Sequence, residues 1–332
     1  MRKWLAGVLI SACTAASQAA VLDYAKLTAP EIGQLDRERT VLIVVGGILE
    51  EHGPWLPSYT DGFASEKLAA DVAAAVGSRP GWNALMLPQV PLGSSGANDI
   101  GGRFVFPGSL VVRSATLRAV YMDLADQLGE AGFRWVLVVS LHGAPLQNRM
   151  LDEASDYFHD AHGGHMLHLY GLMRVLRGWS EGVAKIAPTL ADAERYCVHA
   201  CIDETGIMLA LRPELVDPGY ARATPLTGGN IADLRAIAEM PGWPGYFGAP
   251  AAARAEFGEA VLAALAREMI SAANDLLDGH AERLGARFGD VAGNDPRERA
   301  IDAASLAFDA RIASRQNAWL ERRREAAGAP TP

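Results

Sequence analysis

The chain has 332 residues, of which 50% are hydrophobic, so it can bury a large core. Its 39 acidic residues outnumber 30 basic ones, and the formal net charge is −9. This balance excludes proteins that bind nucleic acid through clustered Lys and Arg. The length lies at the upper edge of what a single α/β domain contains.

The N-terminus has the pattern of a secretory signal peptide. Met1-Arg2-Lys3 is a basic start, residues 4–12 are mostly apolar, and Ser17-Gln18-Ala19 has the small-x-small pattern of a cleavage site. We therefore expect residues 1–19 to be removed and the mature protein to be exported to the periplasm. Residues 10–13 also fit the cleavage motif of a bacterial lipoprotein, in which Cys13 would be lipidated. Ordinary cleavage near Ala19 is favoured over this alternative. No later stretch has the roughly 20 apolar residues of a transmembrane helix.

Strand-like and helical patterns alternate along the rest of the chain. Buried strands are predicted at 41–47, 84–90, 135–141 and 166–170, and helices at 61–75, 114–129 with Ser114 as its cap, 146–161, 251–279 and 295–327. Alternating strands and helices imply an α/β fold, a three-layer αβα sandwich with a mainly parallel sheet. We expect one domain over residues 20–290, followed by a charged helix and frayed tail at 291–332.

Side chains suited to metal binding follow the first predicted strand. Glu50 and His52 are two residues apart, so they project to the same side of an extended backbone, and Asp61 follows a Pro-rich loop. Mixed oxygen and nitrogen ligands suit Zn, Mn or Fe. The alternative is a polar loop with Asp61 as the N-cap of the next helix.

His142 occupies the equivalent place after the strand predicted at 135–141. Open α/β sheets bind ligands at the carboxyl ends of their strands, although a histidine hydrogen-bonded in a turn is the commoner case. The Gly-rich stretch 93–102 lacks the Lys of a phosphate-binding loop. It is interpreted as an active-site loop, with a plain surface loop as the alternative.

Three motifs resemble the creatininase (creatinine amidohydrolase) family. The family's Glu-x-His-Gly-Pro-x-Leu-Pro motif and following Asp are matched by residues 50–57 and Asp61. Its His-Ala-x-x-x-Glu-Thr motif is matched by residues 199–205, and its Phe-Pro-Gly-Thr stretch resembles residues 106–109. The resemblance covers roughly residues 35–217 and implies the same αβα fold.

Two positions depart from creatininase itself. Ala144 stands where creatininase carries a metal-binding Glu, and Trp55 stands where it has a His after Gly-Pro. Creatinine is therefore a doubtful substrate. A second metal would have to take a ligand from elsewhere, and we predict that the Glu204 carboxylate lies within about 5 Å of Asp61 or His52 for this purpose.

The resemblance also implies a mechanism. Two divalent ions (Zn, Mn or Fe) would be bridged by Asp61, one held also by Glu50 and His142 and the other by His52 and Glu204. A metal-activated water would attack an amide carbonyl, with His199 passing a proton to the departing nitrogen and Glu204 as the second catalytic residue. Glu51 is expected either to orient a ligand or to be solvated.

The predicted function is hydrolysis of a non-peptide, cyclic C–N amide bond in a small molecule by a homo-oligomer, which the resemblance implies to be a hexamer. The alternatives are a peptidase of the same family acting on a short modified peptide, and an exported metal- or solute-binding protein with a degenerate site. Cys197 and Cys201 flank His199. Structural thiols, free or paired, are favoured there over metal ligands.

Overall fold

The computed structural model describes residues 20–186 and 198–326. The predicted signal peptide, the lipidation site at Cys13, Cys197 and the end of the predicted tail lie outside these residues. Within the described part of the chain, no helix combines the length and apolar character needed to cross a membrane.

A five-stranded parallel sheet forms the centre of the molecule. Its strands are β1 (Ala20–Asp23), β2 (Thr40–Val45), β3 (Asn83–Met86), β4 (Trp135–Val139) and β5 (His165–His168), in the order β1-β3-β2-β4-β5. Val41 to Val45 pair in register with Trp135 to Val139. All pairings are parallel, which confirms the predicted αβα class.

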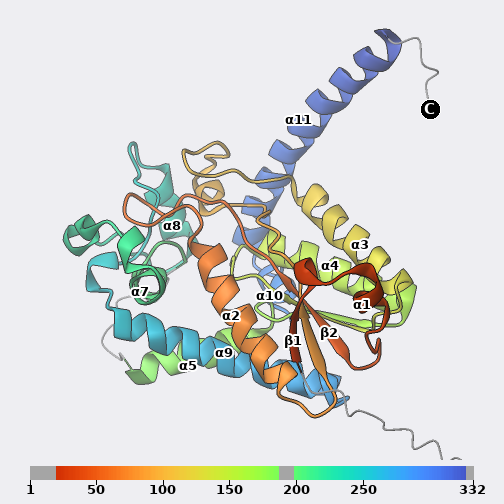
Figure 1. Ribbon diagram of the computed structural model, residues 1–332. Helices are drawn as coiled ribbons and strands as arrows, with labels where there is room; N and C mark the ends of the chain where they lie inside the picture. The colour runs from red at the N-terminus through yellow and green to blue at the C-terminus, as the bar shows by residue number, and fades with distance from the viewer. Residues whose placement is uncertain (1–19, 187–197, 327–332) are drawn as a thin grey trace, which may run out of the picture.

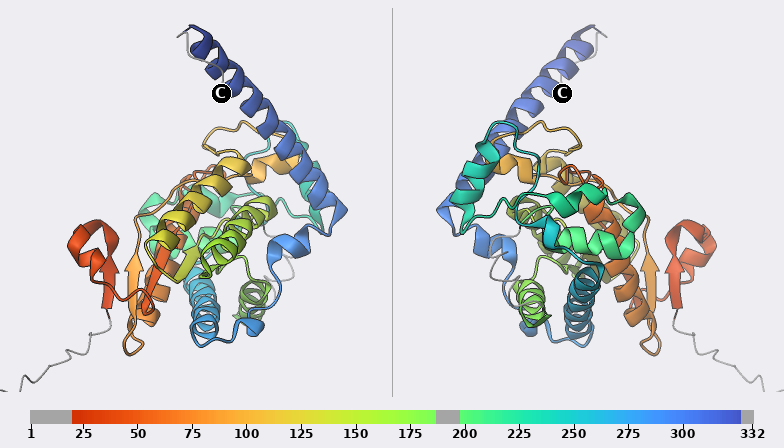
Figure 2. Two further views of the ribbon diagram at one scale, coloured as in Figure 1. Left: turned by 90° about the vertical axis from the view of Figure 1, so that its right-hand side faces the viewer. Right: turned by 90° about the vertical axis from the view of Figure 1, so that its left-hand side faces the viewer.

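Helices cover both faces of the sheet (Figures 1 and 2). Because side chains alternate along a strand, Val41 and Ile43 pack with α2 (Thr60–Gly77), α5 (Met173–Ile186) and α9 (Ala255–Leu277). Leu42 and Val44 point the other way, towards α3 (Ser114–Glu130) and α4 (Pro145–His162). Burial on both faces explains why the β2 sequence is a continuous apolar run.

The remaining elements surround this sandwich. They are α1 (Ala29–Gly33), α7 (Ile202–Leu211), α8 (Ile231–Glu239), α10 (Phe288–Ala292), α11 (Pro296–Ala326), and six short 3₁₀ helices at Tyr24–Lys26, Ala97–Gly101, Pro213–Leu215, Pro218–Arg222, Pro250–Ala252 and Ala281–Arg283. Four strands and five helices lie where they were predicted, with ends that differ by a few residues. The short β1, which forms an edge of the sheet, was not predicted.

The long helix α11 is attached to the sandwich by its first turns and then projects away from it (Figures 1 and 2). Its buried residues are Ile301, Asp302 and Ser305. The predicted cap at Ser114 is wrong: Ser114 is the first residue of α3, and its backbone N–H donates to Asp309 Oδ2 of α11 at 2.8 Å. A carboxylate from another helix thus satisfies the helix N-terminus.

Candidate metal centre

The candidate site lies at the carboxyl ends of β2 and β4. From β2 the chain passes to β3 on one side and then returns to β4 on the other, so these two neighbours mark the point where the strand order reverses. Ligands of open α/β sheets bind at such points. The two strand ends approach each other closely, because a Cβ on Gly46 would lie only 2.6 Å from the Cβ of Ser140.

Six side chains with ligand atoms meet in this place. Glu50 and His52 come from the loop after β2, Asp61 from the first turn of α2, His142 from the loop after β4, His199 from the segment before α7, and Glu204 from α7 itself. Five of them are at most 5% exposed, and Glu204 is half-buried. The predicted metal ligands and the predicted proton donor are therefore brought together from five separate segments.

Their ligand atoms form three overlapping groups, each within 4.8 Å: Glu50, Asp61 and His142; His52, Asp61 and Glu204; and Glu50, His52 and His199. Asp61 connects the first two groups. Its Oδ2 lies 3.1 Å from His142 Nδ1, and its Oδ1 lies 3.3 Å from His52 Nε2. One carboxylate thus offers an oxygen to each of two candidate sites.

Each of the three histidines uses one ring nitrogen to donate to a backbone carbonyl. His52 Nδ1 donates to Glu50 O at 3.1 Å, His142 Nε2 to Ser95 O at 3.0 Å, and His199 Nε2 to Glu51 O at 2.5 Å. A carbonyl can only accept, so these nitrogens carry the proton. The opposite nitrogen of each ring faces carboxylates, which is how metal-binding histidines are oriented in proteins.

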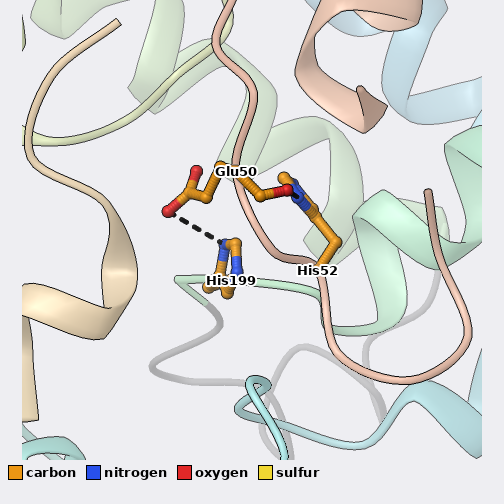
Figure 3. Close-up of side chains that lie close together, drawn as sticks. All are labelled: Glu50, His52 and His199. Carbon is orange, nitrogen blue, oxygen red and sulfur yellow. Dashed lines mark hydrogen bonds and ion pairs between the residues drawn. The ribbon is translucent and has the colours of Figure 1, made fainter. Parts of the chain in front are cut away.

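Figure 3 shows the side chains of Glu50, His52 and His199 close together. The Glu50 carboxylate points towards His199, whose Nδ1 lies 3.9 Å from Glu50 Oε1. The rings of His52 and His199 lie 4.4 Å apart, centroid to centroid. Like the two predicted histidine ligands, His199 turns one ring nitrogen towards a carboxylate, and like His142 it lines a cavity.

The charges of the site compensate one another. Burial would raise the pKa of Glu50, but the positive charges of His142 and His199 hold it at about 2. The pKa of Asp61 likewise lies below its usual range, because His52 and His142 outweigh the effect of burial. Burial alone would lower the pKa of His199, but the negative charge of Glu50 raises it to about 9. Buried carboxylates here need positive charge, and protons on the histidines provide it.

This donor set fits divalent ions. The Glu50 Oε2 atom is buried, and in the described residues its close partner is His142 Nδ1 at 3.0 Å, a nitrogen that could itself bind a cation. Metal binding displaces protons from histidine nitrogens, so ions can replace the protons that now balance the carboxylates. Imidazole and carboxylate ligands together suit Zn, Mn or Fe.

The Gly-rich stretch 93–102 forms one side of the site. The backbone N–H of Ala97 donates to Glu50 Oε1 at 2.5 Å, and Ser95, with φ of 61°, directs its carbonyl to His142. A Cβ on Gly96 would lie 3.2 Å from Glu50 Oε1. The interpretation as an active-site loop is therefore preferred over a plain surface loop.

Glu204 reaches the site from the first turn of α7. Its Oε1 lies 3.8 Å from His52 Nε2, within the predicted 5 Å. The other oxygen, Oε2, accepts a hydrogen bond from the backbone N–H of Ala200. Ala200 adopts φ of 48°, a conformation that costs about 1 kcal/mol for a residue with a Cβ. The surrounding structure thus imposes a strained turn that directs Glu204 and His199 towards the same centre.

Several supporting residues were not apparent in the sequence. Asn148 on α4 donates to the carbonyls of His142 and Ala144, at 3.4 and 2.9 Å, and so holds the loop that carries His142. Ser65 on α2 accepts from the backbone N–H of Leu141 at 2.9 Å. Their position a few residues after predicted ligands is the only sequence signal that could have identified them.

A cavity of about 290 Å³ opens onto the metal-competent cluster. Glu50, His142, His199 and Glu204 line it, together with Tyr170 and Trp179. The cavity gives a small molecule access to these four candidate side chains, whereas His52 and Asp61 are not among the residues that line it. The arrangement can therefore hold cations and expose them to a bound ligand.

A sequence model of the creatininase family, described as creatinine amidohydrolase, matches residues 25–273. The chain belongs to the creatininase family. The names of this family and its members describe hydrolases of amide or peptide bonds. At the level of the family, this chain is therefore a hydrolase. The predicted resemblance is confirmed.

Two curated creatininase-family relatives are each named mycofactocin precursor peptide peptidase. The protein from Mycolicibacterium smegmatis is 24% identical over 73% of this chain and 86% of its own. The protein from Mycobacterium ulcerans is 26% identical over 59% of this chain and 65% of its own.

Solved creatininase structures share the fold. A crystal structure of creatinine amidohydrolase (creatininase) is 21% identical, with a TM-score of 0.56 and coverage of 80% of this chain and 98% of its own. A structure named "Creatininase Mn" has a TM-score of 0.55 at 21% identity, covering 80% of this chain and all of its own.

The two departures from creatininase lie in different environments. Ala144 lines the cavity, where its methyl group offers no ligand atom. Trp55 instead packs on Tyr246, with ring centroids 5.0 Å apart, and is not among the residues that line the cavity. Of the two, Ala144 is thus the departure that faces the space for a ligand.

Two further predicted features have defined positions. Glu51 is buried rather than solvated: its Oε2 accepts from the backbone N–H of Gly53 at 3.1 Å, and its Oε1 lies 3.4 Å from His199 Nε2. Cys201 is disulfide-bonded, which matches a structural role, and Cys197 lies outside the described residues.

Proposed function

We propose that this protein is a metal-dependent amidohydrolase that holds two divalent ions (Zn, Mn or Fe) and cleaves a non-peptide, cyclic C–N amide bond. The observation that carries the proposal is the position of Asp61, one carboxylate shared by two groups of ligand atoms. Membership of the creatininase family supports the choice of reaction, and the related structure named "Creatininase Mn" supports the choice of metal.

Glu50, Asp61 and His142 would hold one ion, and His52, Asp61 and Glu204 the other. When bound, a pair of divalent ions supplies a water that loses its proton near neutral pH and a Lewis acid for the carbonyl. The protein's own contribution is orientation. Backbone carbonyls fix the histidine rings, and the Ala97 and Ala200 N–H groups fix the Glu50 and Glu204 carboxylates.

His199 is the proposed proton donor to the departing amide nitrogen. Its Nε2 is committed to the Glu51 carbonyl, so Nδ1 is the atom available for proton transfer. Glu50 lies 3.9 Å from this nitrogen, and His199 is one of the residues that line the cavity. Glu204 contributes to catalysis by holding an ion and by its charge beside His52.

A second candidate function is cleavage of a short modified peptide. It is favoured by the two curated relatives, both named as peptidases of a precursor peptide. The two candidates use the same six residues and differ in substrate. Further proposals at this level are export to the periplasm and a homo-oligomeric state, as the resemblance implies.

Substitution of a predicted ligand tests the proposal. We expect His52→Ala to abolish hydrolysis and lower the metal content measured by mass spectrometry, tested against small cyclic amides and short peptides. His280→Ala, whose side chain is 44% exposed outside the site, is the control. Full metal content and rate in His52→Ala would overturn the site assignment. A protein that holds metal but cleaves no amide or peptide would instead be a metal- or solute-binding protein.

A further inference from the structure

Part of the cavity wall comes from residues outside the region matched to the creatininase family. That match ends at residue 273. Beyond it, α10 and the first turns of α11 contribute Phe288, Glu298, Ile301 and Asp302 to the same cavity that the candidate ligands line. We therefore expect any substrate preference that is specific to this chain to depend on this C-terminal wall.

The charges on the C-terminal wall are negative and only partly compensated. Asp302 is buried and forms an ion pair with Arg149. Glu298, in contrast, has neither a hydrogen bond nor an ion pair with any described residue, and Arg149 and Arg297 act on it only from a distance. No Lys or Arg is among the described residues that line the cavity. At the C-terminal wall a ligand thus meets a carboxylate that has no close partner, and the described lining residues include no Lys or Arg to offset it.

The rest of the wall is apolar, with one spare hydrogen-bond donor. Leu176, Trp179, Ile231, Phe288 and Ile301 supply apolar surface. The Nε1 atom of Trp179 is buried and has no acceptor among the described residues. It is available to a carbonyl or hydroxyl oxygen of a ligand, because a buried donor is normally satisfied.

We infer that Glu298 and the wall formed by α10 and α11 select amides with an apolar body and a neutral or positively charged end. This inference rests on the proposed amide hydrolysis. A cationic end gains from the Glu298 carboxylate. An anionic end of the same size is repelled by it and finds no Lys or Arg among the described residues that line the cavity.

Three matched amides test the inference: β-alanyl, butyryl and succinyl p-nitroanilide, which carry a positive, a neutral and a negative acyl end. With the metal-loaded protein at pH 8, we expect kcat/KM for the β-alanyl compound to exceed that for the succinyl compound about tenfold or more. Glu298→Gln should reduce this ratio severalfold, and Glu298→Lys should reverse the preference, both with unchanged metal content.

Glu325→Gln is the control, because it removes an equally charged, exposed side chain from the far end of the same helix. A ratio that stays the same in Glu298→Gln and Glu298→Lys would overturn the inference and leave the proposed function intact. If none of the amides is cleaved, the proposed hydrolysis fails for this class, and calorimetric binding of the three compounds decides the inference by the same order of affinities.

Discussion

At the scale of single residues, the centre is defined by which nitrogen of each histidine is free. Backbone carbonyls of Glu50, Ser95 and Glu51 each take one ring N–H, and the opposite nitrogens converge on Glu50, Asp61 and Glu204. Because the orientation comes from main-chain atoms, it exists before a cation or a substrate binds. Such preorganisation is what a metal site requires of its protein.

Replacement of Glu204 tests how the second ion is held. We expect Glu204→Gln to lower the number of bound ions from two to about one, because the amide loses the charge that offsets a divalent ion but can still accept from Ala200. Metal analysis by mass spectrometry measures the count. Glu214→Gln, an exposed substitution just after α7, should keep both ions. Retention of two ions in Glu204→Gln would contradict the assigned ligand.

Asp152 predicts a pH dependence of stability outside the site. Burial raises the pKa of Asp152 to about 7, despite Arg287 nearby, so the folded state holds its proton more tightly than the unfolded state does. Its contribution to the free energy of unfolding is present below about pH 4 and is lost as the pH rises through about 7.

We therefore expect Asp152→Asn to lose less stability than the wild type between about pH 5 and pH 8, by on the order of 2 kcal/mol. Denaturant unfolding at the two pH values measures the difference. Asp160→Asn, exposed on the same helix, should behave as the wild type does. Identical pH dependence in Asp152→Asn would show that Asp152 ionises normally.

At the scale of elements, α11 combines two parts with different roles. Its first turns are held by the Asp302–Arg149 pair, by Ser305 Oγ donating to Asp99 Oδ2 at 2.7 Å, and by Asp309 at the start of α3. The later turns are largely exposed and project from the molecule (Figure 1). Only the first part is expected to contribute to the stability of the sandwich.

Truncation separates the two parts of α11. Removal of residues 311–332 should leave the melting temperature within a few degrees of the full chain, because no buried residue of α11 is lost. Removal of residues 296–332 should lower the melting temperature markedly and open the cavity. Thermal unfolding measures both. A large loss of stability in the shorter truncation would show that the projecting turns contact something, such as a second copy of the chain.

At the scale of the whole molecule, export remains a proposal from the sequence. The basic start, the apolar stretch and Ser17-Gln18-Ala19 predict a mature N-terminus near Ala20, where β1 begins. N-terminal sequencing of protein from the native host measures this directly. A lipid on Cys13 would place the protein at a membrane surface, and an intact Met1 would refute the predicted export.

The sequence by itself determined the layers of the fold and the first ligands. A strand buried on both faces is a continuous apolar run, so β2 and β4 were recognisable, and Glu50, His52 and His142 follow them directly. The short edge strand β1 was missed because four residues carry too little pattern. The cap of α3 was assigned to Ser114, whereas the structure provides Asp309, almost two hundred residues away.

Only the tertiary structure decided which residues meet at the site and what surrounds them. Glu204 and His199 reach the centre through the strained turn at Ala200, and Glu298 lines the cavity from a helix that looks merely charged in the sequence. These contacts join segments up to about 250 residues apart. Local periodicity carries no information about such distances, because they are set by how helices pack on the sheet.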